Sequence, residues 1–304
     1  IGVEFIRNDI EYRVYANKEV IASGGPINSP QLLMLSGVGP RDHLQSLGIQ
    51  VLLDLPVGDN YLNQPSVMLT PKVKPEYLYL TNEIGKINIK QLSELYYEQG
   101  GVLAQHPEVA LFFSTQSNKD KQWPNINIIY RVVNDTIYST AYLARFKSRG
   151  TVRLQSTDPR VHPILNPNWF SHPEDVENAL ESTRMQFYIF EKTQLANYVI
   201  LPKLSDYGCA MCTGRYIYEC TEGLLCYMKY FTYSSLHPGG SCRMGSIDRP
   251  DVVVDPQLRV KYAKNLRVCD SSVFPVVPNS NTAAISITVG YKCSQLIKDA
   301  YNLK

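Results

Sequence analysis

Apolar and polar positions alternate at the start of the chain in the manner of β-strands. Apolar side chains flank a polar Asn8-Asp9 pair on both sides, which predicts a β-hairpin. The apolar run over residues 12–21 predicts a strand that leads into a glycine turn. A helix is expected from Ser29 to Leu35, because Ser can cap free amides and the following proline is tolerated at the first helical position.

Further along the chain, the pattern divides the sequence into three parts. Between residues 66 and 233 aromatic and β-branched residues dominate, which indicates a strand-rich platform with helices on one face. Alternating strand and helix signals occur before and after this insert. The individual elements are expected as helices over 41–47, 176–190 and 281–298 and as strands over 51–55, 126–133, 142–146, 151–155 and 265–268. We therefore predict an α/β (α+β) protein in which 1–65 and 234–304 form one discontinuous domain and 66–233 form a second.

Composition and charge narrow the functional classes. Apolar residues make up 44% and charged residues 19%, which is ordinary for a globular protein with a core. The net charge is +2 and no dense Lys/Arg block is present, so a nucleic-acid partner is not expected. The longest apolar runs, such as Leu32–Leu35, are far too short to cross a bilayer, and we expect no membrane span.

The amino terminus has neither a Met nor a signal-peptide pattern, and the chain opens inside the predicted hairpin. We therefore expect residues upstream of Ile1. The one glycosylation sequon, Asn134-Asp135-Thr136, is compatible with secretion, and an extracellular protein is expected.

Seven cysteines raise the question of metal binding. Cys209 and Cys212 form a lone C-x-x-C pair, and a zinc site would need a second pair at suitable spacing. Cys220 and Cys226 match that spacing poorly. The sequence thus favours buried thiols with one or two disulfides in a loop, and no metal.

Residues 25–39 combine a tight glycine turn with a helix start. Unpaired amides at such a helix amino terminus could face a bound anion or the edge of a flavin. The same pattern is also typical of a plain turn that connects a strand to a helix, with no ligand.

A second candidate is the histidine loop at 236–245, which reads LHPGGSCRMG. Imidazole titrates near neutral pH, so His237 could accept and return a proton during a reaction. A lone histidine is often structural, but a glycine-rich loop makes few packing demands, which favours a functional role.

A third candidate follows the strand predicted at 265–268. Asp270, Ser271 and Ser272 stand at its carboxyl end, where open α/β sheets place ligand contacts. Asn281 opens the last predicted helix and could be either a functional residue or only its cap.

Taken with their order, these motifs resemble the glucose–methanol–choline (GMC) oxidoreductase family. Residues 25–39 are similar to the second signature of that family, and the loop at His237 is similar to its active-site histidine loop. Residues 148–167 resemble the start of the family's carboxyl-terminal region, and residues 253–272 resemble its closing segment. The stretch 31–60 looks most like the insect branch, and the resemblance is weakest between 66 and 140.

The resemblance implies an FAD-dependent enzyme that oxidises an alcohol and passes electrons to oxygen or a quinone. It assigns His237 as the catalytic base, which takes the hydroxyl proton while hydride passes to flavin N5, and Asn281 as its partner, a hydrogen-bond donor to the substrate oxygen. The variable insert near 66–140 would line the substrate pocket. The residues that the resemblance places at the cofactor are Gly25, Pro26, Asn28, Ser29, Asp270, Ser271, Ser272, Asn281 and Thr282.

The chain departs from the family pattern at three points. The Gly-x-Gly-x-x-Gly fingerprint is absent, and Asn63-Gln64 stands where relatives often have Asp-His. The segment from Asn281 to Gly290 is two residues longer than in many oxidases, which would place Ala283 in the second catalytic position. That spacing resembles hydroxynitrile lyases, so a lyase and a non-catalytic relative remain as alternatives to the oxidoreductase.

Overall fold

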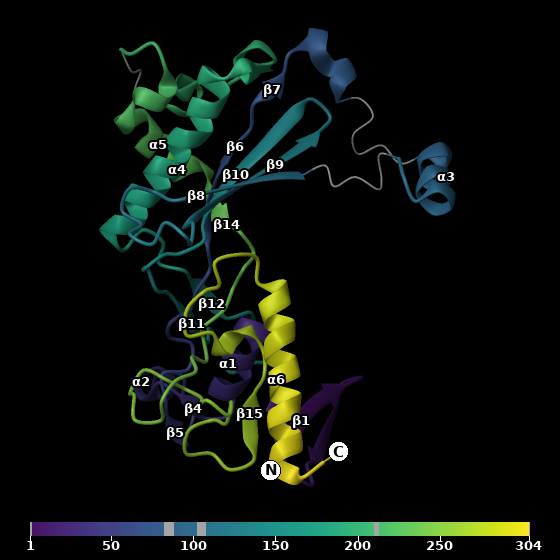
Figure 1. Ribbon diagram of the computed structural model, residues 1–304. Coiled ribbons are helices and arrows are strands. Elements are labelled where there is room, and N and C mark those ends of the chain that lie inside the picture. Colours follow the sequence, from purple (N-terminus) through teal and green to yellow (C-terminus); the bar gives the residue numbers. More distant parts are fainter. Residues whose placement is uncertain (1, 82–87, 102–107, 210–212, 304) are drawn as a thin grey trace. The chain divides into compact units, whose positions relative to one another are not determined.

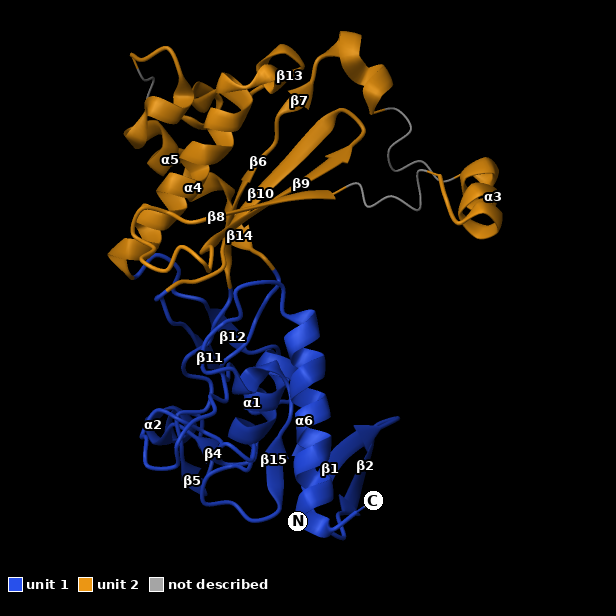
Figure 2. Ribbon diagram, in the orientation of Figure 1, with its two compact units in different colours: residues 1–63, 147–171, 236–304 blue, residues 64–146, 172–235 orange. Residues whose placement is uncertain are grey.

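The computed structural model describes residues 2–81, 88–101, 108–209 and 213–303. The chain divides into two compact units, shown in Figure 2. Unit 1 contains residues 1–63, 147–171 and 236–304, and unit 2 contains residues 64–146 and 172–235. The outer boundaries lie within a few residues of the predicted ones.

One segment belongs to a different unit from the one predicted. Residues 147–171 were expected in the insert, but they return to unit 1. The reason is backbone pairing that the local sequence does not reveal. Tyr61 and Gly150 exchange two N–H···O bonds of 2.9 Å, and the Val152 amide donates to the Gly58 carbonyl at 2.7 Å.

Unit 1 is built from short strands around two long helices, α1 and α6 (Figure 1). Its sheets are small: β1 pairs with β2 and β11 with β12 in antiparallel fashion, while β15 pairs with β3 and β4 with β5 in parallel. The elements are β1 (Gly2–Arg7), β2 (Ile10–Tyr15), β3 (Val20–Ala22), α1 (Gly25–Leu35), β4 (Val38–Gly39), α2 (Arg41–Ser46), β5 (Leu53–Asp54), β11 (Thr151–Arg153), β12 (Ile164–Asn166), β15 (Leu266–Val268), the 3₁₀ helix η6 (Ser271–Val273) and α6 (Ala283–Tyr301).

The amino-terminal hairpin forms as predicted, with Asn8 and Asp9 both at positive φ, of 51° and 60°. Two residues in that conformation match the twist of the flanking strands. The expected continuous strand over 12–21 is wrong. Strand β2 ends at Tyr15. Val20–Ala22 forms the separate strand β3, because it pairs in parallel with β15, more than 240 residues later in sequence.

The core of unit 1 gathers apolar side chains from segments far apart in sequence. Met34 of α1, Val152 of β11 and Val268 of β15 are completely buried in one cluster. Cys293 of α6 joins the same cluster. Helix α1 thus shares one core with strands from the middle and the end of the chain.

Unit 2 contains a seven-stranded antiparallel sheet in its described part, with β10 at the centre between β6, β7 and β9. Its elements are β6 (Pro65–Leu69), β7 (Lys72–Val73), η1 (Pro75–Leu80), α3 (Ile89–Glu98), β8 (Glu108–Phe113), β9 (Ile126–Val133), β10 (Thr136–Leu143), α4 (Pro173–Lys192), η3 (Gln194–Asn197), β13 (Val199–Ile200), η4 (Leu204–Tyr207), η5 (Ile217–Glu219), α5 (Thr221–Phe231) and β14 (Thr232–Ser234). Strand β9 and the core of α4 follow the prediction, whereas β10 begins six residues before the strand expected at 142–146.

Helices α4 and α5 lie together on one side of this sheet (Figure 1), which is the predicted platform arrangement. Buried polar groups hold them there. The Gln186 amide of α4 donates to the carbonyl oxygens of Val67 and Ser139 at 3.2 and 2.7 Å. The Tyr227 hydroxyl of α5 donates to the Met68 carbonyl at 2.9 Å.

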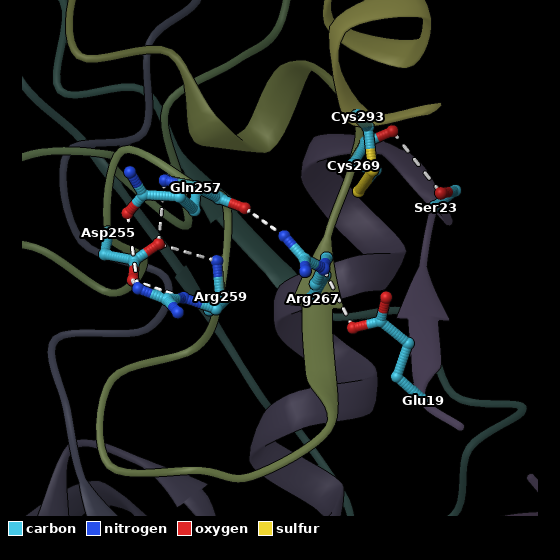
Figure 3. Close-up of a disulfide and its surroundings, with 8 residues drawn as sticks. All are labelled: Glu19, Ser23, Asp255, Gln257, Arg259, Arg267, Cys269 and Cys293. Carbon is cyan, nitrogen blue, oxygen red and sulfur yellow. Dashed lines mark hydrogen bonds and ion pairs between the residues drawn. A yellow bond between two sulfur atoms is a disulfide. The ribbon is translucent and has the colours of Figure 1, made fainter. Parts of the chain in front are cut away.

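Five of the six described cysteines form disulfides, and Cys242 is a buried free thiol. Cys209 pairs with Cys226, Cys269 pairs with Cys293 (Figure 3), and Cys220 is also disulfide-bonded. Cys212, the other member of the predicted C-x-x-C pair, lies outside the described residues. The Cys269–Cys293 bond does not lie within a loop as expected, because it joins the end of β15 to the middle of α6.

A buried ion pair supports the parallel strands β3 and β15. The Arg267 guanidinium donates to Glu19 at 2.8 Å, and the two side chains are only 5% and 6% exposed. The same guanidinium donates to the Gln257 carbonyl at 2.6 Å (Figure 3). Both ends of the pair therefore sit where water cannot replace a lost partner.

We expect Glu19→Gln to lower the free energy of unfolding by about 3–5 kcal/mol, because it leaves the Arg267 charge buried without a counter-ion. Glu4→Gln is the matched control, since the Glu4–Arg13 pair is 71% and 68% exposed and such pairs contribute about 1 kcal/mol or less. Urea denaturation followed by circular dichroism measures both. Equal losses in the two variants would contradict the assignment.

Candidate functional site

The Asp270 carboxylate joins two of the segments singled out in the sequence. One oxygen accepts from the Gly25 amide at 2.9 Å and from the Ser29 hydroxyl at 2.5 Å. The other oxygen accepts from the Ser272 amide at 2.7 Å. The glycine turn at 25–29 and the Asp-Ser-Ser segment therefore share one anionic group, which comes from the chain itself.

This carboxylate stands at the amino terminus of α1. The helix begins at Gly25 rather than at Ser29 as predicted, and Pro26 occupies its first turn. The prediction that Ser29 caps the helix is therefore wrong: Ser29 lies inside α1, where its hydroxyl accepts from the Gly24 amide at 2.9 Å and donates to Asp270. An anion at a helix amino terminus is stabilised by the free amides there. The anion site predicted for this turn is thus filled, at Gly25, by Asp270.

The early start of α1 places Pro30 inside the helix. Proline has no N–H, so it cannot donate to the carbonyl four residues before it, that of Pro26. The hydroxyl of Ser241 donates to this Pro26 carbonyl at 2.6 Å. Ser241 is completely buried and belongs to the histidine loop. The carbonyl that Pro30 leaves without its helical donor therefore becomes an attachment point for the histidine loop.

The histidine loop also runs beside the Asp-Ser-Ser segment. The Gly240 amide donates to the Ser271 carbonyl at 3.0 Å, and the Cys242 amide donates to the Ser272 carbonyl at 2.7 Å. On its other side, Gly239 exchanges two 2.8 Å backbone bonds with Leu62. The loop is thus held along both edges, and all three predicted motifs come together within unit 1.

Gly240 is required at its position on two counts. Its φ is +80°, and an added Cβ would lie 2.5 Å from the Asn60 carbonyl oxygen. The Asn60 side chain donates to the Gly240 carbonyl at 3.2 Å and is itself at a φ of +55°. Sequence reasoning missed Asn60, although its position after the Gly58-Asp59 turn marks it as a residue suited to left-handed backbone.

Leu236 directly precedes the histidine and adopts a φ of +58° with 81% of its surface exposed. A left-handed leucine costs on the order of 1–2 kcal/mol, and such residues cluster at functional sites. His237 itself is half-buried, and this burial lowers the pKa of its imidazole below the ordinary 6.5. The ring is therefore neutral at physiological pH and able to accept a proton.

The second predicted catalytic position lies just before α6. The helix begins at Ala283, with Thr282 at the capping position, so Asn281 is not its cap as one reading held. Asn281 is exposed and lies one residue outside the helix boundary. The pairing of His237 with Asn281 stays a prediction, as does the alternative that Ala283 occupies the second position and His237 acts alone.

Several features of these segments suit a polar cofactor. The oxygen atoms Ser272 Oγ and Asn279 Oδ1 are buried without a hydrogen-bond partner among the described residues. Gly25, at a φ of +82°, faces open space where a side chain would otherwise stand. Buried oxygens without a partner and a glycine that faces open space suit a ligand that brings hydroxyl and N–H donors, as the ribityl chain and ring of a flavin do.

Other residues singled out in the sequence differ in their surroundings, and some of them have a structural role. Asn28 is exposed on the first turn of α1. Asn63 and Gln64, the departure from the family's Asp-His, are both buried, and Trp169 donates to the Asn63 carbonyl at 2.7 Å. Burial raises the pKa of the Cys242 thiol, so this group stays protonated.

The described residues contain neither a metal-binding cluster nor a membrane-spanning helix. No group of three or more His, Cys, Asp or Glu side chains there could hold a metal ion. Within the same residues, no helix combines the length and apolar character needed to cross a membrane.

We expect Asp270→Asn to lower the free energy of unfolding by about 2–4 kcal/mol, because the charge that three donors share is removed. Asp158→Asn provides the comparison, since Asp158 binds Arg160 at the surface and its substitution should lower the free energy of unfolding much less. Guanidinium denaturation distinguishes them. A loss at Asp270 no larger than at Asp158 would show that the carboxylate does not hold these segments.

A double-mutant cycle tests the Ser241 attachment. Ser241→Ala alone should cost about 1–3 kcal/mol, because the partly buried Pro26 carbonyl loses the hydroxyl that donates to it. In a Pro30→Ala background the new amide can reach that carbonyl, and the same substitution should cost less than about 1 kcal/mol. Additive losses would mean that the proline gap and Ser241 are unrelated.

Comparisons with known proteins identify both flanks of the chain. Residues 1–66 match the amino-terminal family model and residues 147–290 match the carboxyl-terminal family model, each described as GMC oxidoreductase. Together these matches cover more than half of the chain.

Among characterised relatives, mitochondrial choline dehydrogenase of Homo sapiens is 32% identical over 318 residues, which cover 98% of this chain and 50% of that protein. Oxygen-dependent choline dehydrogenase of Sinorhizobium fredii is 34% identical over 307 residues, which cover 97% and 54%. The chain therefore spans about half the length of the curated relatives it matches.

Solved structures share the fold. A formate oxidase of Aspergillus oryzae superimposes with a TM-score of 0.83 at 24% identity, covering 100% of this chain and 58% of that one. A fungal aryl-alcohol oxidase gives a TM-score of 0.76 at 23% identity, with coverages of 97% and 56%. These likenesses confirm the predicted fold class, a mixed α/β architecture with a strand-rich second unit.

Proposed function

Because the chain belongs to the GMC oxidoreductase family, we propose that it is part of an FAD-dependent enzyme that oxidises an alcohol, with His237 as the catalytic base. The observation that supports this most directly is the position of His237. Its loop shares hydrogen bonds with both the 25–29 turn and the 270–272 segment, the two motifs assigned to the cofactor.

In the proposed reaction, His237 accepts the proton of the substrate hydroxyl. Its imidazole is neutral at physiological pH because burial lowers its pKa, and a neutral ring is the form that takes a proton. When bound, FAD supplies the hydride-accepting chemistry for the carbinol carbon. The protonated ring can then release its proton after the hydride has left.

Asn281 is proposed as the donor to the substrate oxygen. An amide N–H stabilises developing alkoxide charge without competing for the proton. Its exposure and its place before α6 leave its side chain accessible from solvent. The side chain of Ala283, the first residue of α6, could not donate such a bond. Asn281→Ala should therefore slow the reaction if Asn281 is the donor, and leave the rate unchanged if Ala283 occupies that position.

We propose that the cofactor is held by the nine residues named from the sequence, with different roles. Asp270 and Ser29 shape the turn, while Ser272 Oγ and Asn279 Oδ1 are buried oxygens without a hydrogen-bond partner among the described residues. The relatives named for choline, and the structures named for formate and aryl alcohols, point to small polar substrates. Oxygen or a quinone takes the electrons.

The test is flavin reduction in the full-length protein. We expect it to purify yellow, to be bleached anaerobically by a small alcohol such as choline, and to react about 10²–10⁴-fold more slowly in His237→Ala. His162→Ala is the matched control, since His162 is an exposed histidine of the same unit and should leave the rate unchanged. Equal rates in the three proteins would refute His237 as the base.

The pH profile gives an independent reading. The base must be neutral, so kcat/KM should be constant above neutral pH and fall as the pH drops through the lowered pKa of His237, below 6.5. The acidic limb should vanish in His237→Ala.

Cyanide release from a cyanohydrin with the flavin still oxidised would instead favour the lyase, and purification without flavin would favour a non-catalytic relative.

A further inference from the structure

The β9–β10 hairpin of unit 2 carries a feature that the proposed oxidation does not use. Its two-residue turn is Asn134-Asp135, and Thr136 begins β10. These three residues form the single Asn-x-Ser/Thr sequon of the 304-residue chain. We propose that Asn134 is a site of N-linked glycosylation, whose ligand is an oligosaccharide delivered from a lipid diphosphate carrier.

The turn presents Asn134 in a suitable way. The residue is exposed, and its side-chain amide makes no hydrogen bond within the described part of the chain. Its φ of +53° is a left-handed conformation that asparagine tolerates better than most residues. A sugar on this side chain would therefore extend into solvent from the tip of the hairpin without displacing any packed group.

The disulfides supply a second, independent argument. Cys209–Cys226 and Cys269–Cys293 lie in different units, so each unit contains at least one bond that forms in an oxidising compartment. In eukaryotic cells that compartment is the endoplasmic reticulum lumen, where the glycosyl transferase acts on nascent chains. The same environment would thus form the disulfides and modify Asn134.

Thr136 indicates when transfer takes place. In the folded hairpin its side chain is buried, accepts from Lys72 at 2.6 Å and donates to Asp135 at 2.8 Å. The sequon hydroxyl is therefore not available to an enzyme once β10 has paired with β7. We place the transfer before this pairing, on the unfolded chain.

The step conserves atoms and is redox-neutral. The Asn134 amide nitrogen attacks C1 of the first sugar and forms the N–C1 bond. The bond between C1 and the diphosphate oxygen breaks, and the lipid diphosphate leaves with the electron pair. The amide nitrogen gives up one proton to a base of the transferase.

Two glycine variants of the same turn make a matched pair. Asn134→Gly removes the acceptor, and its positive φ is one that glycine adopts freely. Asp135→Gly changes the adjacent residue but keeps an Asn-Gly-Thr sequon. Each variant of the full-length protein carries a cleavable signal peptide and a carboxyl-terminal Asn-Gly-Thr tag, which reports entry into the lumen.

The three proteins are translated with microsomal membranes, and their glycans are counted by gel mobility before and after endoglycosidase treatment. We expect Asn134→Gly to carry one glycan fewer than the wild type and Asp135→Gly, with the tag modified in all three. Equal numbers of glycans on the wild type and on Asn134→Gly would overturn the proposal, because every sugar would then lie elsewhere.

Discussion

The organisation of unit 1 around its candidate site depends on one carboxylate. Asp270 follows the buried strand β15, and it accepts from the amide of Gly25, the hydroxyl of Ser29 and the amide of Ser272. These donors belong to segments about 240 residues apart. Because a carboxylate close to helix amides is stabilised by several charge-assisted bonds, the start of α1 and the end of β15 are held together. The histidine loop is then laid against both.

The histidine loop and its surroundings contain residues in places that their residue type or backbone conformation does not favour. Pro30 lies inside a helix, Leu236 is in a left-handed conformation, and Gly240 has no room for a side chain. Each exception is offset by a specific tertiary contact or serves one, such as the bond from Ser241 to the Pro26 carbonyl. Proteins tend to keep such departures where function requires a fixed geometry. Their concentration around His237 agrees with the proposed role of that residue.

The two units differ in how their frameworks are stabilised. Unit 2 has a continuous antiparallel sheet covered by α4 and α5, with buried amide and hydroxyl groups donating to strand carbonyls. Unit 1 has only short two-stranded sheets among its described residues, and long-range polar links such as Glu19–Arg267 and the Cys269–Cys293 bond connect them. The site therefore lies in the unit whose architecture depends most on contacts between distant segments.

The sequence alone determined the elements with strong local signals and the identity of the chemical groups. The Asn8-Asp9 turn, strand β9 and the body of α4 follow from turn chemistry and periodicity, and His237, Asp270 and the 25–29 turn were recognised as motifs. Such signals are local, so a single segment contains them.

Only the tertiary structure decided how these groups meet. Nothing near Gly25 in sequence reveals that Asp270 completes its helix start, and nothing near Ser241 reveals the carbonyl left free by Pro30. The return of residues 147–171 to unit 1 likewise depends on backbone pairing with Gly58 and Tyr61. Hydrogen bonds between distant segments leave no periodic trace in the sequence, because each partner satisfies its local pattern equally well without the other.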